Sequence, residues 1–462
     1  MLTAGLTACA VGPDYVRPES AAPDAWRTPL AGGLAALPPD QAALARFWTT
    51  LGDPMLDQLV EQALVHNYDV AQAEARLRQT RALRDFAIGA FFPHITGNAG
   101  GQHSQATGRQ TSNSISVTNY FATLDASWEI DVFGRLRRGL EAANADRDAA
   151  VENLRDVQVS LVAELALTYV DARALQERLR IAEATRASQS ETFDLTDWRA
   201  QAGLTTELDV ERARSALATT EAVIPTLETA LAADMNGIAI LVGAPPGDLT
   251  ALLAPPEPIP VTPLEVAVGV PAETLAQRPD VRRAERDLAA ETARVGVVTA
   301  DAYPSLNALG SIGLEALSPP GLLEAGAKTA TLAVSASQTL FKGGQVIATI
   351  QAQEAVRDEV LASYQATVLS ALNEVENALV AYAQEQDRRK ALAEGTAAAE
   401  RALVLAQDQY GSGLIDFQVV LDAQRSLFLL QDQLAASEGQ VTSNLVRLFK
   451  ALGGGWTPGT TS

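Results

Sequence analysis

Residues 115–132 read ISVTNYFATLDASWEIDV, and this stretch decides the fold. Apolar and polar side chains alternate along it, which is typical of a β-strand with two different faces. One face carries Tyr120, Ala122, Leu124, Ala126, Trp128 and Ile130; the other carries Asn119, Thr123, Asp125, Ser127 and Glu129, with Phe121 as the exception. A half-buried strand of a soluble sheet alternates in the same way. The pattern alone therefore does not identify a membrane strand.

A second alternating stretch lies about 210 residues further along the chain. Its apolar positions are Ala330, Leu332, Val334, Ala336 and Leu340, and its polar positions are Thr331, Ser335, Ser337 and Thr339. Residues 93–102 and 305–313 supply a partner strand for each stretch. Each chain thus offers four strands, whereas the smallest membrane barrels have eight. A barrel made from these strands therefore requires further copies of the chain.

Each strand pair is followed directly by a very long helical stretch. Residues 134–200 and 343–410 contain no proline and little glycine. At 1.5 Å per residue such a helix is about 100 Å long. An ordinary coiled-coil rod is the simplest alternative for these stretches, but it does not explain why each one is joined to an alternating strand.

The chain reads as two copies of one unit. Asp69-Val70 recurs as Asp280-Val281, 211 positions later, and Ala202-Gly203-Leu204 recurs as Ser412-Gly413-Leu414, 210 positions later. We predict copies at residues 52–242 and 271–452, each ordered as a helix, a strand pair, a very long helix, a reversal and a return helix. In the first copy the opening helix is expected over residues 56–90. The proline-rich residues 243–270 form a connector, residues 10–51 an extended segment and residues 453–462 a tail.

Composition excludes several classes of function. The net charge is -21, with 56 acidic and 35 basic residues, which argues against a nucleic-acid partner. The single cysteine, Cys9, permits no internal disulfide and no zinc site of several thiolates. No nucleophile elbow, phosphate-binding loop or histidine ligand spacing occurs, so we expect no enzyme, no metal site and no catalytic residue.

The first nine residues indicate a lipid anchor. Leu6-Thr7-Ala8-Cys9 has the order of a bacterial lipoprotein cleavage site, with Cys9 as the lipidated residue. Only eight residues precede Cys9, which is short for a secretory leader. We therefore expect residues 1–9 to be part of a longer signal, and a covalent lipid, with no other cofactor, on Cys9.

Several motifs together resemble the TolC-like outer-membrane efflux proteins, in particular the lipoprotein subgroup that includes OprM. They are Cys9 to Pro18 (CAVGPDYVRP), Leu51 to Leu56 (LGDPML), Gln277 to Glu285 (QRPDVRRAE), Phe341 to Gly344 (FKGG) and Tyr410 to Gln424. The resemblance covers nearly the whole chain. It implies a mixed α and β membrane protein in which a homotrimer forms a 12-stranded β-barrel, four strands from each protomer, continued by a long α-helical barrel into the periplasm. It also implies three kinds of partner: outer-membrane lipids, a periplasmic adaptor protein and a proton-driven inner-membrane pump.

The resemblance also assigns candidate sites. It implies that the reversals at Gly203, Leu204, Gly413 and Leu414 contact the adaptor, although a glycine helix end is needed there in any case. Asp422, and with less support Asp209, are candidates for the periplasmic gate. Both aspartates are expected in the first turns of the return helices, where an acidic residue also stabilises a helix by about 0.3–1 kcal/mol. Alternation places Asp125 and Glu129 in the lumen.

We expect the chain to be a passive outer-membrane duct of an efflux system. Within transport, the alternative is the outlet of a type I protein secretion system, whose pump is ATP-driven. In another class, the alternative is a periplasmic coiled-coil scaffold without a pore. The sequence does not name the transported substrate.

Overall fold

The computed structural model describes residues 10–18, 23–38, 40–107, 114–261, 263 and 265–456. Cys9 and the rest of the predicted signal lie outside the described residues. The chain divides into two units. We call the first the strand unit (Met1–Glu19, Ala75–Val151 and Arg283–Ala366) and the second the core unit (Ser20–Glu74, Glu152–Arg282 and Thr367–Ser462).

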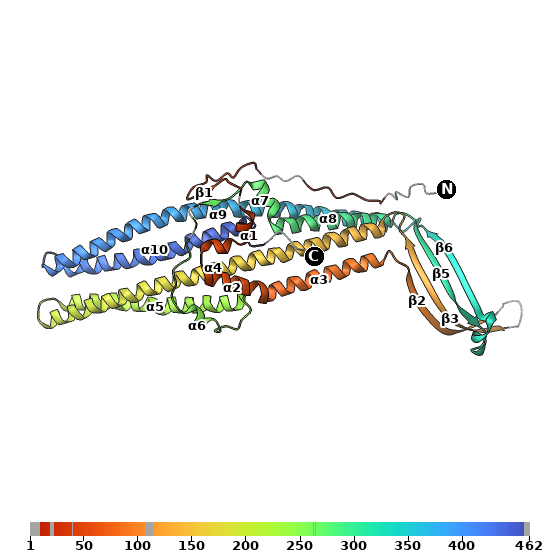
Figure 1. The fold of residues 1–462 in the computed structure, drawn as a ribbon, viewed down its shortest axis with the longest axis horizontal. Coiled ribbons are helices and arrows are strands. Elements are labelled where there is room, and N and C mark those ends of the chain that lie inside the picture. The colour runs from red at the N-terminus through yellow and green to blue at the C-terminus, as the bar shows by residue number, and fades with distance from the viewer. Residues whose placement is uncertain are drawn as a thin grey trace. The chain divides into compact units, whose positions relative to one another are not determined.

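The same succession of elements occurs twice along the chain (Figure 1). The first series is α2 (Pro54–His66), α3 (Tyr68–Gly89), β2 (His94–Thr107), β3 (Ser114–Ile130), α4 (Arg135–Gln201) and α5 (Glu207–Leu241). The second is α7 (Pro271–Gln277), α8 (Pro279–Ala300), β5 (Ser305–Ala316), β6 (Lys328–Ser337), α9 (Gln345–Gly411) and α10 (Phe417–Ala451). Helices α4 and α9 have 67 residues each, and α5 and α10 have 35 each. Their common origin as one repeated unit stays our prediction.

The opening helix of each series is interrupted, which corrects the single helix expected over residues 56–90. Asn67 has an extended backbone, and its side-chain oxygen accepts the N–H groups of Asp69 (2.8 Å) and Val70 (3.2 Å) at the start of α3. Its amide nitrogen donates to the carbonyl of Leu241 (3.0 Å), the last residue of α5. A buried side chain that satisfies three backbone groups favours the break over a continuous helix.

Arg278 plays the same part 211 positions later. It separates α7 from α8 with an extended backbone, and it donates to the carbonyl of Ala451 (2.7 Å), the last residue of α10. It also pairs with Asp280 and Glu374, each at 2.7 Å, which balances the charge of this buried guanidinium. In each series, therefore, the break in the opening helix binds the end of the return helix.

The hydrophobic core of the core unit surrounds these helix ends. Phe47, in the 3₁₀ turn Phe47–Leu51, stacks on Phe449 of α10 with ring centroids 5.3 Å apart. Tyr169 of α4 is buried and donates its hydroxyl to Asp53 (2.7 Å), which caps α2. The remaining elements are α1 (Gln41–Ala45), α6 (Thr250–Leu253), and a two-residue parallel pair of β1 (Leu34–Ala35) with β4 (Val266–Ala267). Residues 243–270 therefore contain short elements rather than a plain linker.

The four long strands form one antiparallel sheet in the strand unit, in the order β2-β3-β5-β6 (Figure 1). Two 3₁₀ turns, Pro320–Leu323 and Ala325–Ala327, lie between β5 and β6. Strand β6 ends at Ser337, so Leu340, which the alternation assigned to this strand, lies beyond it. No helix of the described residues is long and apolar enough to cross a membrane.

Candidate functional sites in the sheet and at the helical reversals

The sheet has one polar and one apolar face. Directly opposed residues on antiparallel strands point to the same side, so the register assigns every side chain to a face. Asp125 of β3, for example, lies opposite Thr96 of β2 and Ser311 of β5, which in turn lies opposite Thr331 of β6. The next residue, Leu124, lies opposite Gly97 and Ile312. The alternation read in single strands thus continues across all four.

The apolar face is exposed to an unusual degree. Its large side chains have high exposed fractions: Ile95 67%, Leu124 54%, Ile312 61%, Leu332 83% and Val334 68%. An apolar surface of this kind marks a site of contact with lipid or protein. Strands β2 and β6 are the sheet's two edges, each paired on one side only within the described chain. Unpaired edges are templates for pairing with another chain.

The structure places Asp125 and Glu129 on the polar face. Asp125 accepts hydrogen bonds from Asn98 (2.6 Å) and Thr123 (2.9 Å). Glu129 accepts from Nε of Arg135 (2.8 Å), the first residue of α4. Sequence reasoning missed a third carboxylate on this face, Glu315, because the expected strand ended at residue 313. Glu315 lies two residues after Gly313, so continuing the two-residue period of this strand would have placed it on the polar face.

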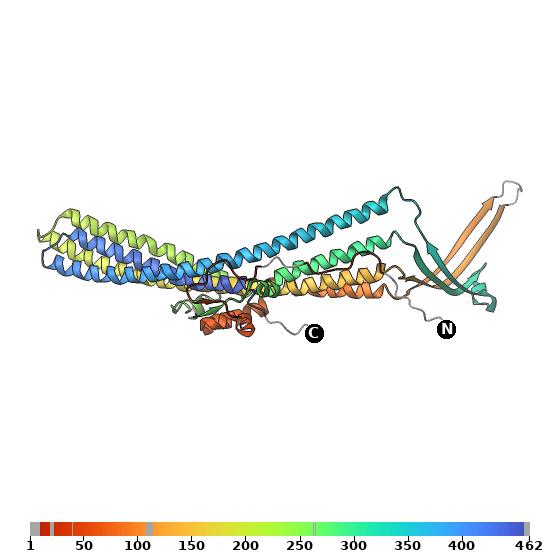
Figure 2. The same cartoon turned by 90° about the horizontal axis from the view of Figure 1, so that it is seen from above.

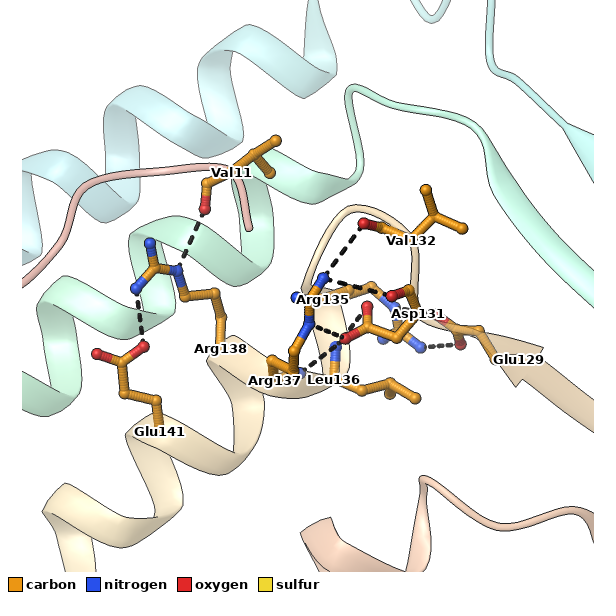
Figure 3. A network of polar contacts seen from close by, with 9 residues as sticks. All are labelled: Val11, Glu129, Asp131, Val132, Arg135, Leu136, Arg137, Arg138 and Glu141. Atoms are coloured by element: carbon orange, nitrogen blue, oxygen red, sulfur yellow. Dashed lines mark hydrogen bonds and ion pairs between the residues drawn. The ribbon is translucent and has the colours of Figure 1, made fainter. Parts of the chain in front are cut away.

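The turn from β3 into α4 is held by a polar network, which Figure 3 shows from close by. Asp131 accepts the N–H groups of Leu136 (3.2 Å) and Arg137 (3.0 Å), which have no helical partner at the start of α4. Arg138, which is 5% exposed, donates to the carbonyl of Val11 (3.3 Å) and pairs with Glu141 (2.8 Å). The network therefore joins the strand end, the helix start and the N-terminal segment.

The N-terminal segment is fitted closely at this turn. Val11 donates its N–H to the carbonyl of Phe133 (3.1 Å), and Asp14 pairs with Arg138 (2.6 Å). Gly12 has φ +88°, and a Cβ there would lie 2.4 Å from Cα of Gly296 in α8. Only glycine meets both conditions. The residues that follow the predicted lipid site are thus positioned by specific contacts.

The two reversals have the same backbone. Leu204 N–H bonds to the carbonyl of Arg199 (2.8 Å) and Gly203 N–H to that of Ala200 (2.9 Å); Leu414 bonds to Gln409 (2.9 Å) and Gly413 to Tyr410 (3.0 Å). These are Schellman helix ends, which require the positive φ values of 75° at Gly203 and 72° at Gly413. Leu204 and Leu414 are 70% and 74% exposed. Both leucines therefore project from the reversals with no packing role of their own.

The two candidate gate aspartates differ in their surroundings. Asp209 is the third residue of α5 and forms a capping box with Thr206, the N-cap. Burial alone would raise its pKa, but hydrogen bonds from Thr205 and Thr206 outweigh that effect and lower the pKa below its usual value. Helix capping thus accounts for Asp209.

Asp422 is the sixth residue of α10, in the second turn rather than the expected first, because α10 begins at Phe417. Its side chain is 54% exposed and contacts Gln418 (3.2 Å) and Arg425 (3.6 Å) on the same helix. It makes no capping hydrogen bond, unlike Asp209. Its exposed contacts along the helix contribute only about 0.2–0.5 kcal/mol each, so helix capping does not account for Asp422.

The two helical hairpins, α4–α5 and α9–α10, run alongside each other in the core unit (Figure 2). Arg178 of α4 forms a bidentate pair with Asp432 of α10 (2.7 and 3.1 Å). Nearer the reversals, Gln424 of α10 donates to Thr192 of α4 (3.0 Å), and Arg199 lies over the ring of Tyr410 (4.9 Å). Sequence reasoning missed these contacts, since nothing in the sequence pairs the two hairpins.

The described residues hold no group of three or more His, Cys, Asp or Glu side chains placed to bind a metal ion. The sites of interest are thus an amphipathic sheet with open edges and a pair of helical reversals. Together with the very long helices, these sites are typical of a class of membrane protein that combines an amphipathic β-sheet with long helical hairpins.

Comparison with known proteins identifies the family within that class. The family profile described as "Outer membrane efflux protein" matches residues 59–244 and 270–454. Nodulation protein T of Rhizobium leguminosarum bv. trifolii is 31% identical over 458 residues, covering 98% of this chain and 96% of the relative. The toluene efflux pump outer membrane protein TtgF of Pseudomonas putida is 31% identical over 469 residues, covering 98% and 96%.

A solved structure, that of the outer-membrane channel OprN, matches with a TM-score of 0.92 at 37% identity, covering 97% of this chain and all of that one. The chain belongs to the outer membrane efflux protein family. It is an outer-membrane component of an efflux system, as the sequence analysis predicted.

The capping box at Asp209 leads to a prediction about pH. A carboxyl whose pKa is lowered by folding stabilises the folded state fully above its unfolded pKa, near 3.9, and this contribution is lost as the pH falls through the folded pKa. We expect amide hydrogen exchange in residues 204–212, corrected for intrinsic rates, to be slow at pH 6 and faster below pH 4.

A substitution at the N-cap tests the same capping box. Thr206→Ala should weaken the cap by about 1 kcal/mol, which increases the equilibrium constant for local opening roughly fivefold. Thr219→Ala, whose hydroxyl bonds only to Ser215 within α5, is the matched control. Equal exchange in the two variants would contradict the capping role.

Proposed function

We propose that three copies of this chain close their sheets into one 12-stranded barrel, which conducts efflux substrates passively across the outer membrane. The observation that carries this proposal is the exposed apolar face of a sheet with two unpaired edges. A β6 edge that pairs with the β2 edge of the next copy removes every edge once the ring is complete. The same closure turns the apolar face toward lipid and the polar face toward a water-filled lumen.

The length of the apolar face along its strands agrees with the thickness of the apolar layer of an outer membrane. Its positions on β3 run from Tyr120 to Ile130, about 34 Å along a strand at roughly 3.4 Å per residue. A strand tilt near 45° reduces this to about 24 Å, close to the apolar band of about 25 Å in outer-membrane barrels. Beyond Tyr120 the same face becomes polar, since His103 contacts Thr118 (2.9 Å) and Ser116 (3.3 Å) there. The band therefore ends where a membrane would.

The helices and reversals are proposed to form the periplasmic part. We place the adaptor contact at the exposed Leu204 and Leu414 with their turn glycines, Gly203 and Gly413. The expected partners are a periplasmic adaptor and a proton-driven inner-membrane pump. Full-length relatives named for efflux pumps, such as the toluene efflux protein, support an efflux duct over the outlet of a protein secretion system or a scaffold without a pore.

A covalent lipid on Cys9 is proposed as an additional anchor. Val11, two residues later, is held at the carbonyl of Phe133, just beyond the end of β3. One acyl chain alone gives only marginal membrane binding, so the barrel supplies most of the anchoring.

We expect the intact mass of the protein from membranes to exceed the mass of the chain that begins at Cys9 by that of the added acyl groups. The same measurement on Cys9→Ser should show no such addition. An unmodified mass for the parent protein would contradict the lipid anchor.

Trimer formation and conductance test the proposed barrel together. The purified protein should have the mass of three chains after correction for detergent, and it should conduct ions across a planar bilayer.

A pair of variants tests the assignment of the two faces. Leu332→Arg places a charge on the lipid face, which costs about 2–4 kcal/mol near the bilayer centre. It should reduce the amount of trimer in outer membranes, whereas Thr331→Arg, on the adjacent lumen-facing position, should not. A monomer without conductance would overturn the proposal, and equal losses in both variants would refute the assignment of faces.

Asp422 is proposed to line the periplasmic gate, where three carboxylates would repel one another and attract cations. In single-channel recordings Asp422→Ala should change the gating pattern and weaken block by multivalent cations. Asp408→Ala, an exposed carboxylate of α9 outside the proposed gate, is the matched control and should leave both unchanged. Behaviour of Asp422→Ala identical to the parent would remove Asp422 from the gate; Asp209, which its cap explains, is a weaker second candidate.

A further inference from the structure

A cavity of about 960 Å³ lies within the core unit. Its wall is formed by the turn before α2, one side of α4, the short helix α6 and the connector. Most of the wall is apolar, with Leu51, Met55 and Leu252 beside several prolines of the connector. Pockets that bind small molecules have volumes of about 300–1,000 Å³ and apolar walls with a few polar groups. The cavity therefore has the size and the lining of a ligand pocket.

One basic side chain, that of Arg173 in α4, lies in this wall. Arg173 is 2% exposed, so its charge is almost completely removed from bulk water. Its Nη1 donates to the side-chain oxygen of Gln176 (2.7 Å) and to the carbonyl of Pro255 (2.9 Å), whereas its Nε has no hydrogen-bond partner. A buried donor without a partner is rare in folded proteins. Arg173 therefore has a free N–H group beside the cavity.

Arg173 also lacks a counter-ion among the described residues, since the groups that accept its hydrogen bonds are neutral. Asp53 lies in the same wall, but its oxygens accept the N–H groups of Met55 (2.9 Å) and Leu56 (3.0 Å) at the start of α2. It also accepts the hydroxyl of Tyr169 (2.7 Å). The guanidinium of Arg173 lies over the ring of Tyr169, 4.9 Å from the centroid, which stabilises a cation without neutralising it. Because buried charges are normally paired, an anion is missing beside Arg173.

We propose that this cavity binds a small amphipathic carboxylate, with its carboxylate group on Arg173 and its apolar body against Leu51, Met55 and Leu252. The Nε and Nη2 atoms of an arginine present two parallel N–H groups, which match the two oxygens of a carboxylate. A monoanion fits better than a phosphate dianion, because the wall has one cation and also contains the carboxylates of Asp53 and Glu257. The site lies within the core unit of one chain, so it does not depend on closure of the proposed barrel.

The bound anion would help to hold the connector on α4. Arg173 and Gln176 already donate to the carbonyl of Leu253, the last residue of α6, at 3.4 and 2.8 Å. A ligand that binds the folded protein alone stabilises it in proportion to its occupancy. We therefore expect the ligand to slow amide hydrogen exchange in residues 253–261, which lie beside Arg173.

The test uses fluorine NMR of two probes of the same shape, para-trifluoromethylbenzoate and the neutral para-trifluoromethylbenzamide, with the purified full-length protein at neutral pH. Protein-free detergent micelles correct for partition of each probe. The benzoate signal should broaden saturably with the protein, and the benzamide signal should not. Arg173→Gln should weaken binding of the benzoate roughly tenfold or more, because a hydrogen-bonded charge pair is lost.

Two further variants separate binding from folding, since Arg173→Gln also removes contacts of the connector. Ala251→Trp fills the cavity from an exposed position of α6 and keeps Arg173, so it should abolish binding of the benzoate with an unchanged circular dichroism spectrum. Arg180→Gln, at an exposed arginine of the same helix that pairs with Glu177 (2.6 Å), is the matched control and should bind normally.

Three results would overturn this inference: no saturable binding of the benzoate to the folded parent protein, equal binding of the two probes, or binding that neither Arg173→Gln nor Ala251→Trp alters. A protein that binds the benzoate as expected but forms no trimer and conducts no ions would instead count against the proposed pore alone.

Discussion

The structure depends on one constraint: a four-stranded sheet with an exposed apolar face and two unpaired edges needs neighbours on its edges and a nonpolar medium against that face. Large side chains such as Leu332 and Val334 are exposed along β6, and β2 and β6 each lack a second partner in the described chain. Exposure of these groups to water would be costly, and open edges invite uncontrolled pairing. A closed ring of sheets in a lipid bilayer removes both problems at once.

The helices impose a second requirement, which each series meets in the same way. A return helix of 35 residues ends with free carbonyl groups, and in both cases a side chain from the break in the opening helix reaches one of them. Asn67 binds Leu241, and Arg278 binds Ala451. The two residues differ in size and charge, so Arg278 needs Asp280 and Glu374 beside it where Asn67 needs no counter-ion. One backbone arrangement is thus stabilised by two different chemistries.

The two helical reversals, at Gly203 and Gly413, share one turn geometry but differ in how the helix that follows is capped. Their backbones have the same Schellman hydrogen bonds, but the residues that follow differ. Thr206 and Asp209 form a capping box, whereas Asp416, the N-cap of α10, makes no side-chain capping hydrogen bond. The carboxylate of Asp422, in the second turn, has exposed contacts to Gln418 and Arg425. An exposed carboxylate with only weak contacts along its own helix remains available to act on a neighbouring chain or on a passing ion.

The sequence by itself determined the strand faces, the two very long helices, the reversals at Gly203 and Gly413, and the family. These features follow from local rules: a period of two in a strand, the absence of proline in a helix, and the positive φ that glycine permits. Tertiary structure alone decided the break at Asn67, the partner of Glu129 and the link from Arg178 to Asp432. Each of these joins groups that are distant in sequence or depends on which neighbour satisfies a buried polar atom. Local periodicity contains no information about such pairs, because it describes which way a side chain points and not what it meets.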